Sequence, residues 1–587
     1  MITTLGRAGK DRTLRILFFF GVGLGIFLAV GRSGFNITDE GFVLDWSYRI
    51  LHGAIPHRDI MTAHLQGSGL LHILDLMAPT PVLATSRLIA IMEIVAYSAL
   101  LAAITFATPF RRWRLPQLVG VVAAIVINVH TFPLMAWYTF DGILFCSVGI
   151  YLLMSAPRPL PARRVAVAMG LLGAAAVMKQ SFGPAAPLGV LAVAALTFRE
   201  GWRSSVTKAM MAGGVSLLPF AAYTGWVAAA GGFPDMIREL TNATPEWGWR
   251  FLNGEPDGPT AVANAAPLLL PMAAAFIAVF LGARLRIAYR WGRWLGLLGF
   301  VVGALAIAVT LAIGQLSLYG VWGLMVEGFL AIWLVLNAAF RRQFDGAAFW
   351  LGALGWMASL SWGPSNNNLV AGSIVILLLH RLWTTAALPV RVRLARWPAR
   401  LGALKGGVLS IALILLLVFA FHASQTQPYR DLPAEQQTSR PGEIAAAYGW
   451  IETGAPTMAY LRQIDDCIAA YPASRISIVP DTPAQHVVYD RAAALPVSLL
   501  DPLEYRGSET QILEAASRLD AEGDYLVLFQ STWDGQGYYK GLPNTTSLGT
   551  PVFDYGDHSF YSALQSALTG QRYVCGSLIA AYKPPAS

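Results

Sequence analysis

The chain of 587 residues is 55% apolar, only 13% of its residues are charged, and it contains 18 tryptophans. Together with a mean hydropathy of +0.52, this composition is typical of a polytopic membrane protein rather than a soluble one. The formal net charge of +8 does not indicate nucleic-acid binding, because the basic residues cluster in short connections between apolar runs. Three cysteines cannot form a disulfide framework, and the sequence has no zinc-type cysteine spacing and no nucleotide-binding glycine signature.

Apolar runs follow one another through the first 424 residues. A membrane crossing needs about 20 apolar residues, and the sequence predicts about thirteen crossings. The first run follows the basic stretch Arg7–Arg15 and is predicted to be an uncleaved helix. The runs at 165–181 and 185–198 are short, so they are either two helices or one broken or re-entrant element. The candidate runs are 14–31, 82–107, 117–135, 138–155, 165–181, 185–198, 207–230, 262–283, 294–313, 318–338, 346–362, 368–385 and 406–422.

The arginines and lysines orient these runs. Alternate connections are rich in positive charge, and the positive-inside rule places them in the cytoplasm together with the N-terminus. The opposite connections, including the loop at 33–81, and everything after residue 423 then lie outside the cytoplasm. The predicted location is a bacterial inner (plasma) membrane, crossed many times, with an extracytoplasmic (periplasmic) C-terminus. The basic connections are Arg111–Arg114, Arg158–Arg164, Arg199–Lys208, Arg284–Arg293, Arg341–Arg342 and Arg391–Lys405.

The C-terminal part has the composition of a soluble domain. Residues 442–587 are predicted to form a small α/β domain, joined by a linker at 425–441 to a transmembrane catalytic domain at 1–424. The pattern predicts strands at Arg475–Val479 and Asp524–Phe529, helices at Pro483–Tyr489 and Glu509–Leu519, and a closing strand at Tyr573–Tyr582. Cys467 and Cys575 both fall here, and an oxidising compartment permits either a disulfide or two buried thiols.

The first outer loop, 33–81, concentrates ionisable residues. Asp39 and Glu40 precede a helical pattern at Glu40–His52, with Thr38 as the expected N-cap, and this amphipathic helix is expected to lie in the headgroup layer. A carboxylate backed by cations can remove a proton from an acceptor hydroxyl and neutralise a departing phosphate. The alternative is structural, because an acidic pair also stabilises the start of a helix.

Two stretches of this loop resemble a family. Asp39-Glu40-Gly41-Phe42 and Tyr48–Asp59, which ends in His57-Arg58-Asp59, are similar to the first outer loop of GT-C glycosyltransferases such as protein O-mannosyltransferases and lipid A aminoarabinose transferases. The small α/β domain at the C-terminus is also similar to that of many bacterial members. The resemblance implies that Asp39 is the catalytic base with Glu40 as the runner-up, and that the donor is a polyprenyl-phosphate sugar. His57 replaces the tyrosine of the family's Tyr-Arg-Asp.

Lys179 is the best second site. It stands at the outer end of an apolar run, where an ionisable residue is a functional candidate. Relatives carry a similar Lys-Gln here, so the resemblance implies that Lys179 binds the donor phosphate. The alternative is a lysine that snorkels to the interface. Further candidates for the phosphate are Arg58 and Arg250, and those for the sugar or acceptor are His57, Asp59, His64, Gln66, Trp247, Trp249, Asn366 and Asn367.

These observations predict a glycosyltransferase of the hexosyl- or pentosyltransferase type. It would move a sugar from a lipid-borne donor to a hydroxyl of an envelope glycan, glycolipid or protein on the outer face of the bilayer. No cofactor is required, since a phosphate leaving group needs a cation and the acceptor needs a base; a divalent metal is compatible but not indicated. A polysaccharide ligase or polymerase and a secondary transporter are the alternatives, although a transporter would be expected to show repeats and midplane polar residues.

Overall fold

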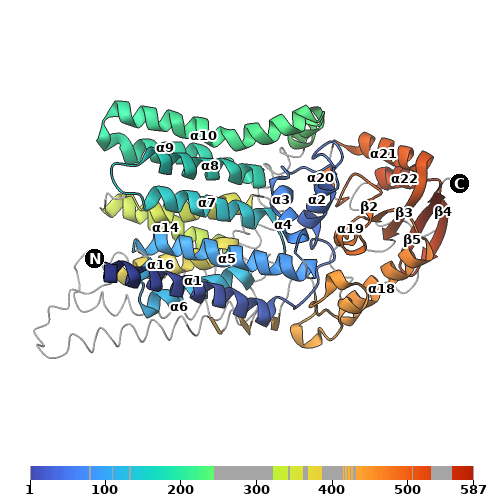
Figure 1. Cartoon of the computed structure of the whole chain (residues 1–587), viewed down its shortest axis with the longest axis horizontal. Coiled ribbons are helices and arrows are strands. Elements are labelled where there is room, and N and C mark those ends of the chain that lie inside the picture. The colour runs from blue at the N-terminus through green and yellow to red at the C-terminus, as the bar shows by residue number, and fades with distance from the viewer. Residues whose placement is uncertain are drawn as a thin grey trace, which may run out of the picture.

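The computed structural model describes residues 2–78, 81–108, 110–130, 134–242, 322–341, 344–360, 368–385, 431–500, 502–505, 507–530 and 558–585, with a few positions between 414 and 426. The described chain is mostly helical, with a bundle of long helices at one end and an α/β domain at the other (Figure 1). The bundle helices are α1 (Ile2–Val30), α5 (Val82–Phe106), α6 (Leu115–His130), α7 (Tyr138–Met154), α8 (Ala162–Met178), α9 (Ala185–Thr197), α10 (Trp202–Ala229), α14 (Trp322–Arg341), α15 (Gly346–Ser359) and α16 (Ala371–Thr385).

The predicted apolar runs that fall within the described residues are helices. Two segments, Val82–Phe106 and Gln180–Glu200, are long and apolar enough to cross a membrane, and several shorter apolar helices accompany them. The predicted runs at 262–283 and 294–313, and most of 406–422, lie outside the described residues. The pair at 165–181 and 185–198 forms two helices, α8 and α9, that pack against each other across a 3-10 turn at Gln180–Phe182.

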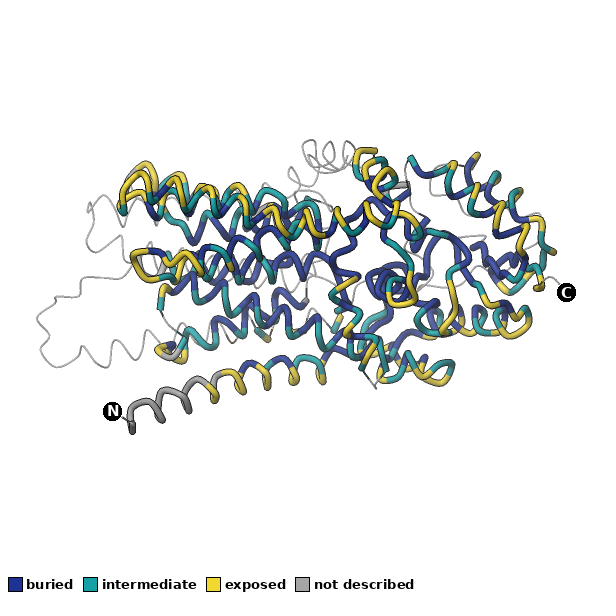
Figure 2. Tube along the Cα trace, turned by 45° about the horizontal axis from the view of Figure 1, so that its top comes forward, coloured by how far each residue is buried: buried dark blue, intermediate teal, exposed yellow. Residues whose placement is uncertain are grey.

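The central helices of the bundle are the most buried, and the outer helices are the most exposed. α8 packs between α7 and α10, and α5 packs against α1, α6, α7 and α16. Figure 2 shows the central helices largely buried, while α1, α9 and α10 expose one side. Those exposed sides carry large apolar residues, among them Leu17, Leu28, Leu191, Met210 and Leu217. Exposed apolar surface of this extent marks contact with lipid or with another protein.

The C-terminal domain contains one mixed sheet in the order β2-β1-β3-β5-β4. β1 pairs in parallel with β2 and β3, whereas β5 runs antiparallel to β3 and β4. The strands are β1 (Arg475–Val479), β2 (Ala492–Ala493), β3 (Gly523–Gln530), β4 (Gln571–Cys575) and β5 (Leu578–Pro585), and the helices are α18 (Ala455–Ala470), α19 (Ala484–Tyr489), α20 (Pro502–Tyr505), α21 (Glu509–Glu522) and α22 (His558–Ala567).

The strands and helices predicted at the start of this domain are present, but the closing strand was predicted wrongly. Tyr573–Tyr582 spans a hairpin, because Gly576 has φ +62° and reverses the chain between β4 and β5. The structure also joins Cys467 on α18 to Cys575 at the end of β4 in a disulfide. Cys146 is a free, buried thiol in α7.

The first outer loop lies between the two parts of the molecule. Its helices α2 (Phe42–Leu51), α3 (Gly67–Leu71) and α4 (Ile73–Leu76) sit between the bundle and the sheet domain (Figure 1). Phe42–Arg49 is buried throughout, so the expectation of an interfacial helix is wrong: the sheet domain covers the face predicted to meet headgroups. The Thr38 N-cap is also wrong, because α2 starts later, after Gly41, and has no side-chain cap.

Candidate functional site

Asp39 is held by a turn of its own loop. The Asn36 amide nitrogen donates a hydrogen bond of 2.8 Å to Asp39 Oδ2, and Asn36 Oδ1 accepts from the backbone N–H groups of Thr38 and Asp39. This is an Asx-type turn, in which a short polar side chain replaces backbone partners. It fixes the orientation of the Asp39 carboxylate, which is 8% exposed.

Glu40 has a different environment from its neighbour. Both of its oxygens accept from the Arg87 guanidinium, at 2.7 and 2.6 Å, and Arg87 also donates to the carbonyls of Gly31 and Gly34. Burial raises the pKa of Glu40, and the charge of Arg87 opposes that effect. This bidentate pair ties the loop to α5, so Glu40 is engaged structurally and Asp39 remains the better candidate for a base.

Lys179 points into the protein. It is 1% exposed, its Nζ donates to Thr139 Oγ1 at 2.9 Å, and it lies 5.1 Å from the centre of the Tyr138 ring. A snorkelling lysine would instead extend its ammonium to the interface. The geometry therefore places a buried amine beside a hydroxyl and an aromatic face. Burial lowers the pKa of Lys179 to about 7, and an anion bound beside the amine would favour its charged form.

Glu504, a carboxylate of the C-terminal domain, contacts Thr62 and His64 of the first outer loop. Glu504 on α20 accepts from Thr62 Oγ1 at 2.9 Å and lies 3.0 Å from His64 Nε2. Burial acts to raise the pKa of Glu504, but His64 and the hydrogen bond from Thr62 outweigh it, so the net pKa is lowered and Glu504 is ionised at neutral pH. The Gln180 amide, next to Lys179, lies 3.4 Å from the other ring nitrogen of His64.

Tyr138 lies at the centre of these groups. Its ring is 4.7 Å from the His64 ring and stacks on Trp137 at 4.6 Å. Phe42, three residues after Asp39, lies with its ring 6.3 Å from that of Tyr138. The structure therefore brings the predicted residues Asp39, His64 and Lys179 together around one tyrosine, with Glu504 added from the C-terminal domain.

His57, another predicted residue of the loop, belongs to a second group of side chains together with Glu239 and Tyr223. His57 Nδ1 lies 2.6 Å from Glu239 and its Nε2 lies 3.0 Å from the Tyr223 hydroxyl. Burial lowers the pKa of His57 to about 3, with a smaller contribution from the charge of His64, and raises that of Glu239. We therefore interpret this contact as a neutral pair that shares one proton.

Three other predicted positions have structural partners here. Arg58 and Asp59 form an exposed ion pair at 2.8 Å, and Arg58 also donates to the Ala230 carbonyl. The Gln66 amide donates to the Ile60 carbonyl within the same loop. The remaining candidates lie outside the described residues, namely Trp247, Trp249, Arg250, Asn366 and Asn367.

Sequence reasoning missed several residues of this site. Arg87 lies inside an apolar run, and a charge inside such a run is a signal that could have identified it. Asn36 and Tyr138 have no comparable signal, because single polar or aromatic residues are common at the ends of apolar runs. Glu504 lies 440 positions from His64 in sequence, and only the docked domain brings the two together.

A potential metal-binding triad lies elsewhere in the same loop region. His72, Glu93 and Asp141 each offer one ligand atom, and these atoms all lie within 4.8 Å of one another. All three side chains are buried. One nitrogen and two carboxylate oxygens are a donor set suited to zinc.

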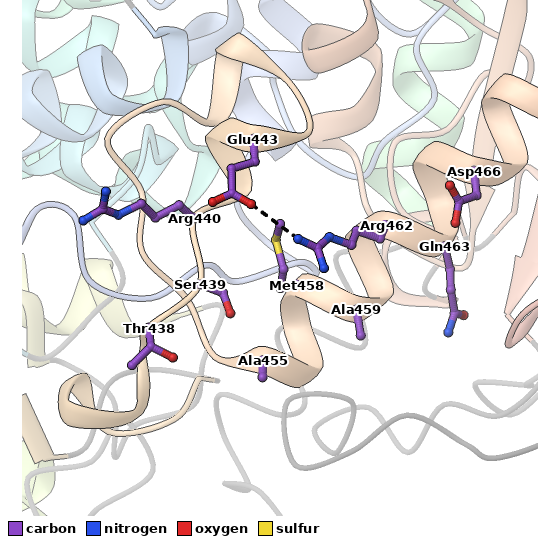
Figure 3. A pocket seen from close by; sticks show the side chains of 10 residues that line it. All are labelled: Thr438, Ser439, Arg440, Glu443, Ala455, Met458, Ala459, Arg462, Gln463 and Asp466. Carbon is purple, nitrogen blue, oxygen red and sulfur yellow. Dashed lines mark hydrogen bonds and ion pairs between the residues drawn. The ribbon is translucent and has the colours of Figure 1, made fainter.

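A depression of about 450 Å³ lies in the C-terminal domain, away from the residues around Tyr138. It is lined by α18 and the segment before it, and Figure 3 shows Glu443 and Arg462 directed toward each other across it, at 3.4 Å. Both side chains are more than half exposed. The lining contains none of the residues predicted from the sequence.

No family model matches the chain, and neither does any curated protein. The function proposed below therefore rests on the residues of this chain.

Proposed function

We propose that the protein is a membrane glycosyltransferase. It transfers a sugar from a polyprenyl-phosphate donor to a hydroxyl of an envelope glycan, glycolipid or protein on the outer face of a bacterial inner membrane. Asp39 is the general base and Lys179 neutralises the departing phosphate. The observation that carries the proposal is the convergence of Asp39, Lys179, His64 and Glu504 around Tyr138.

The outer surface of the bundle supports a membrane location. Large apolar side chains are exposed along α1, α9 and α10, and water would not favour that arrangement. Combined with the basic connections on one side, it supports a polytopic protein with a cytoplasmic N-terminus. In that orientation the first outer loop and the sheet domain face the compartment in which lipid-linked sugars, and not nucleotide sugars, are presented.

The proposed chemical step needs one base and one cation. Asp39 takes the proton of the acceptor hydroxyl while the acceptor oxygen forms a bond to the anomeric carbon. The bond from that carbon to the phosphate oxygen breaks, and the electron pair leaves with the polyprenyl phosphate. A phosphate anion needs little protonation, so the Lys179 ammonium and the Thr139 hydroxyl suffice to hold it. We propose that no metal acts on the reacting atoms.

Asp39→Asn is the direct test. The amide keeps the size of the side chain but cannot accept a proton, so transfer should fall by about 100-fold or more. The assay measures transfer from radiolabelled polyprenyl-phosphate sugars in purified membranes. Asp235→Asn is the matched control, because Asp235 only pairs with Arg238 at a partly exposed position. Full activity in Asp39→Asn, with the control also active, would remove Asp39 as the base.

Lys179→Met tests the phosphate role. Methionine preserves much of the buried apolar volume and removes the charge, so the KM for the donor should rise while the KM for the acceptor changes little. An unchanged dependence on donor concentration would assign Lys179 to packing alone.

A further inference from the structure

A second polar cluster lies between the first outer loop and the bundle. His72 stands between α3 and α4, Asp75 lies in α4, Glu93 in α5 and Asp141 in the first turn of α7. All four side chains are at least nine-tenths buried, with exposed fractions of 1%, 2%, 8% and 0%. The proposed transferase chemistry uses none of them.

The charges of this cluster do not balance. It contains three carboxyl groups, those of Asp75, Glu93 and Asp141, and one imidazole, that of His72. A buried carboxylate without a compensating charge is unfavourable by several kcal/mol. Even a protonated His72 neutralises only one of the three, so a further positive charge, carried by a bound cation or by a proton on a carboxyl group, would stabilise the cluster.

Two oxygen atoms in the cluster have no donor. Among the described residues, Asp141 Oδ2 and Glu93 Oε2 are buried and have no hydrogen-bond partner apart from the contact between the two carboxyl groups themselves. Buried acceptors are paired in most structures. The carboxyl groups of Asp141 and Glu93 each supply one oxygen to the set of possible ligand atoms, which lie within 4.8 Å of one another, so the unpaired oxygens belong to residues of that set.

His72 is oriented as metal-bound histidines are. Its Nδ1 lies 2.9 Å from Asp75 Oδ2, and its Nε2 faces Asp141 Oδ1 at 3.3 Å. A carboxylate on one ring nitrogen fixes the tautomer that leaves the other nitrogen free to bind a metal. Two ligand atoms of a tetrahedral zinc with bonds near 2.1 Å are separated by about 3.4 Å, which is close to the observed spacing.

We propose that His72 Nε2, Asp141 and Glu93 bind a divalent transition metal, best fitted by Zn²⁺, with Asp75 orienting the histidine. Imidazole as a ligand disfavours Mg²⁺ and Ca²⁺, which take oxygen ligands. The site joins α3–α4 to α5 and α7. Its role is therefore to fix the first outer loop against the bundle, a role that does not depend on the proposed transferase activity.

Metal content is the test. The full-length protein, purified in detergent, stripped with a chelator and dialysed against Zn²⁺, should retain about one zinc per chain by elemental analysis. Asp141→Asn and His72→Ala should lose it, and Asp75→Asn should bind it about 10- to 100-fold more weakly, because Asp75 acts through the histidine. His52→Ala is the matched control, since His52 is an exposed imidazole of the same loop, bonded to the Tyr48 carbonyl, and it should bind as wild type does.

If the variants fail to fold, a measurement on the wild-type protein alone still tests the proposal. Adding Zn²⁺ to the stripped protein should raise its unfolding temperature, whereas Mg²⁺ and Ca²⁺ should not. Co²⁺ in its place should give the visible absorption bands of a tetrahedral site. Absence of bound metal and of any thermal shift would overturn the proposal and leave a proton shared by Glu93 and Asp141. Equal zinc content in Asp141→Asn would overturn it as well.

Discussion

Adjacent acidic residues in the first outer loop serve different purposes because their partners differ. Glu40 is bound at both oxygens by Arg87, which also ties down two backbone carbonyls. Asp39 is oriented by a neutral amide from Asn36 instead. A carboxylate in a bidentate ion pair is a poor base, because proton uptake would break the pair. The resemblance ranks Asp39 ahead of Glu40, but the physical difference between the two carboxylates depends on Arg87, which lies 47 positions away from Glu40.

The His57–Glu239 pair makes stability depend on pH in a defined way. Burial lowers the pKa of His57 from 6.5 to about 3 and raises that of Glu239 well above 4.5. Between pH 4.5 and 6.5 the folded and unfolded pair each hold one proton. Above pH 6.5 only the folded pair keeps its proton, so stability falls as pH rises toward the folded pKa of Glu239. Below pH 4.5 the unfolded pair binds more protons, so stability also falls as pH decreases.

Glu239→Gln tests this assignment. Glutamine resembles the protonated acid but cannot lose a proton, so the decline above pH 6.5 should disappear. The stability of the variant relative to wild type should then rise by about 1.4 kcal/mol per pH unit over that range. Denaturation of the detergent-solubilised protein at pH 6.5, 7.5 and 8.5 measures the difference. If the stabilities of wild type and variant change with pH in parallel, Glu239 is ionised in the folded protein.

Helix α2 lies between the bundle and the sheet domain and packs against α19 of the sheet domain. Gly41, which precedes it, has φ +95°, and a Cβ there would lie 2.5 Å from Ala484 Cα of α19. Both the backbone conformation and the close approach require glycine at this position. One turn later, Asp45 lies 2.6 Å from His486 Nδ1, whose other ring nitrogen lies 2.9 Å from the Ile476 carbonyl.

Asp45→Asn should weaken the docking of the two parts. Asp45 is fully buried, and removal of one partner from a buried ion pair lowers the free energy of unfolding by about 3–5 kcal/mol. The partly exposed Arg238–Asp235 pair provides the comparison, since Asp235→Asn should cost about 0–1 kcal/mol. Hydrogen exchange should report faster exchange in α2 and α19 in the first variant only. Unchanged exchange in both helices would show that docking rests on the apolar contacts.

At the scale of the whole molecule, the first outer loop is part of the core. It contacts the bundle through Arg87 and the sheet domain through Asp45 and through the backbone pair Met61–Pro496, at 2.7 Å. A loop held on both sides can position Asp39 and His64 without a separate scaffold. The same arrangement makes Glu504 part of the proposed site, so the sheet domain contributes directly to its chemistry.

The proposed topology makes a labelling prediction. In a Cys146→Ser background, Arg462→Cys in the sheet domain should react with a membrane-impermeant maleimide in intact cells, whereas Arg163→Cys in the first turn of α8 should react only after permeabilisation. Both side chains are exposed in the structure, so burial does not explain a difference. Labelling of Arg163→Cys alone in intact cells would invert the topology and place Asp39 on the cytoplasmic side.

Hydrophobic periodicity and composition determined the helices of the bundle, the sheet domain and the polar character of the first outer loop. These features are local in sequence, so a window of about 20 residues contains the signal. The tertiary structure alone decided that Glu40 pairs with Arg87, that His57 pairs with Glu239, that Glu504 joins His64, and that His72 meets Glu93 and Asp141. Each of these contacts joins residues far apart in the chain, and packing of the helices and docking of the domain fix them, which no local pattern records.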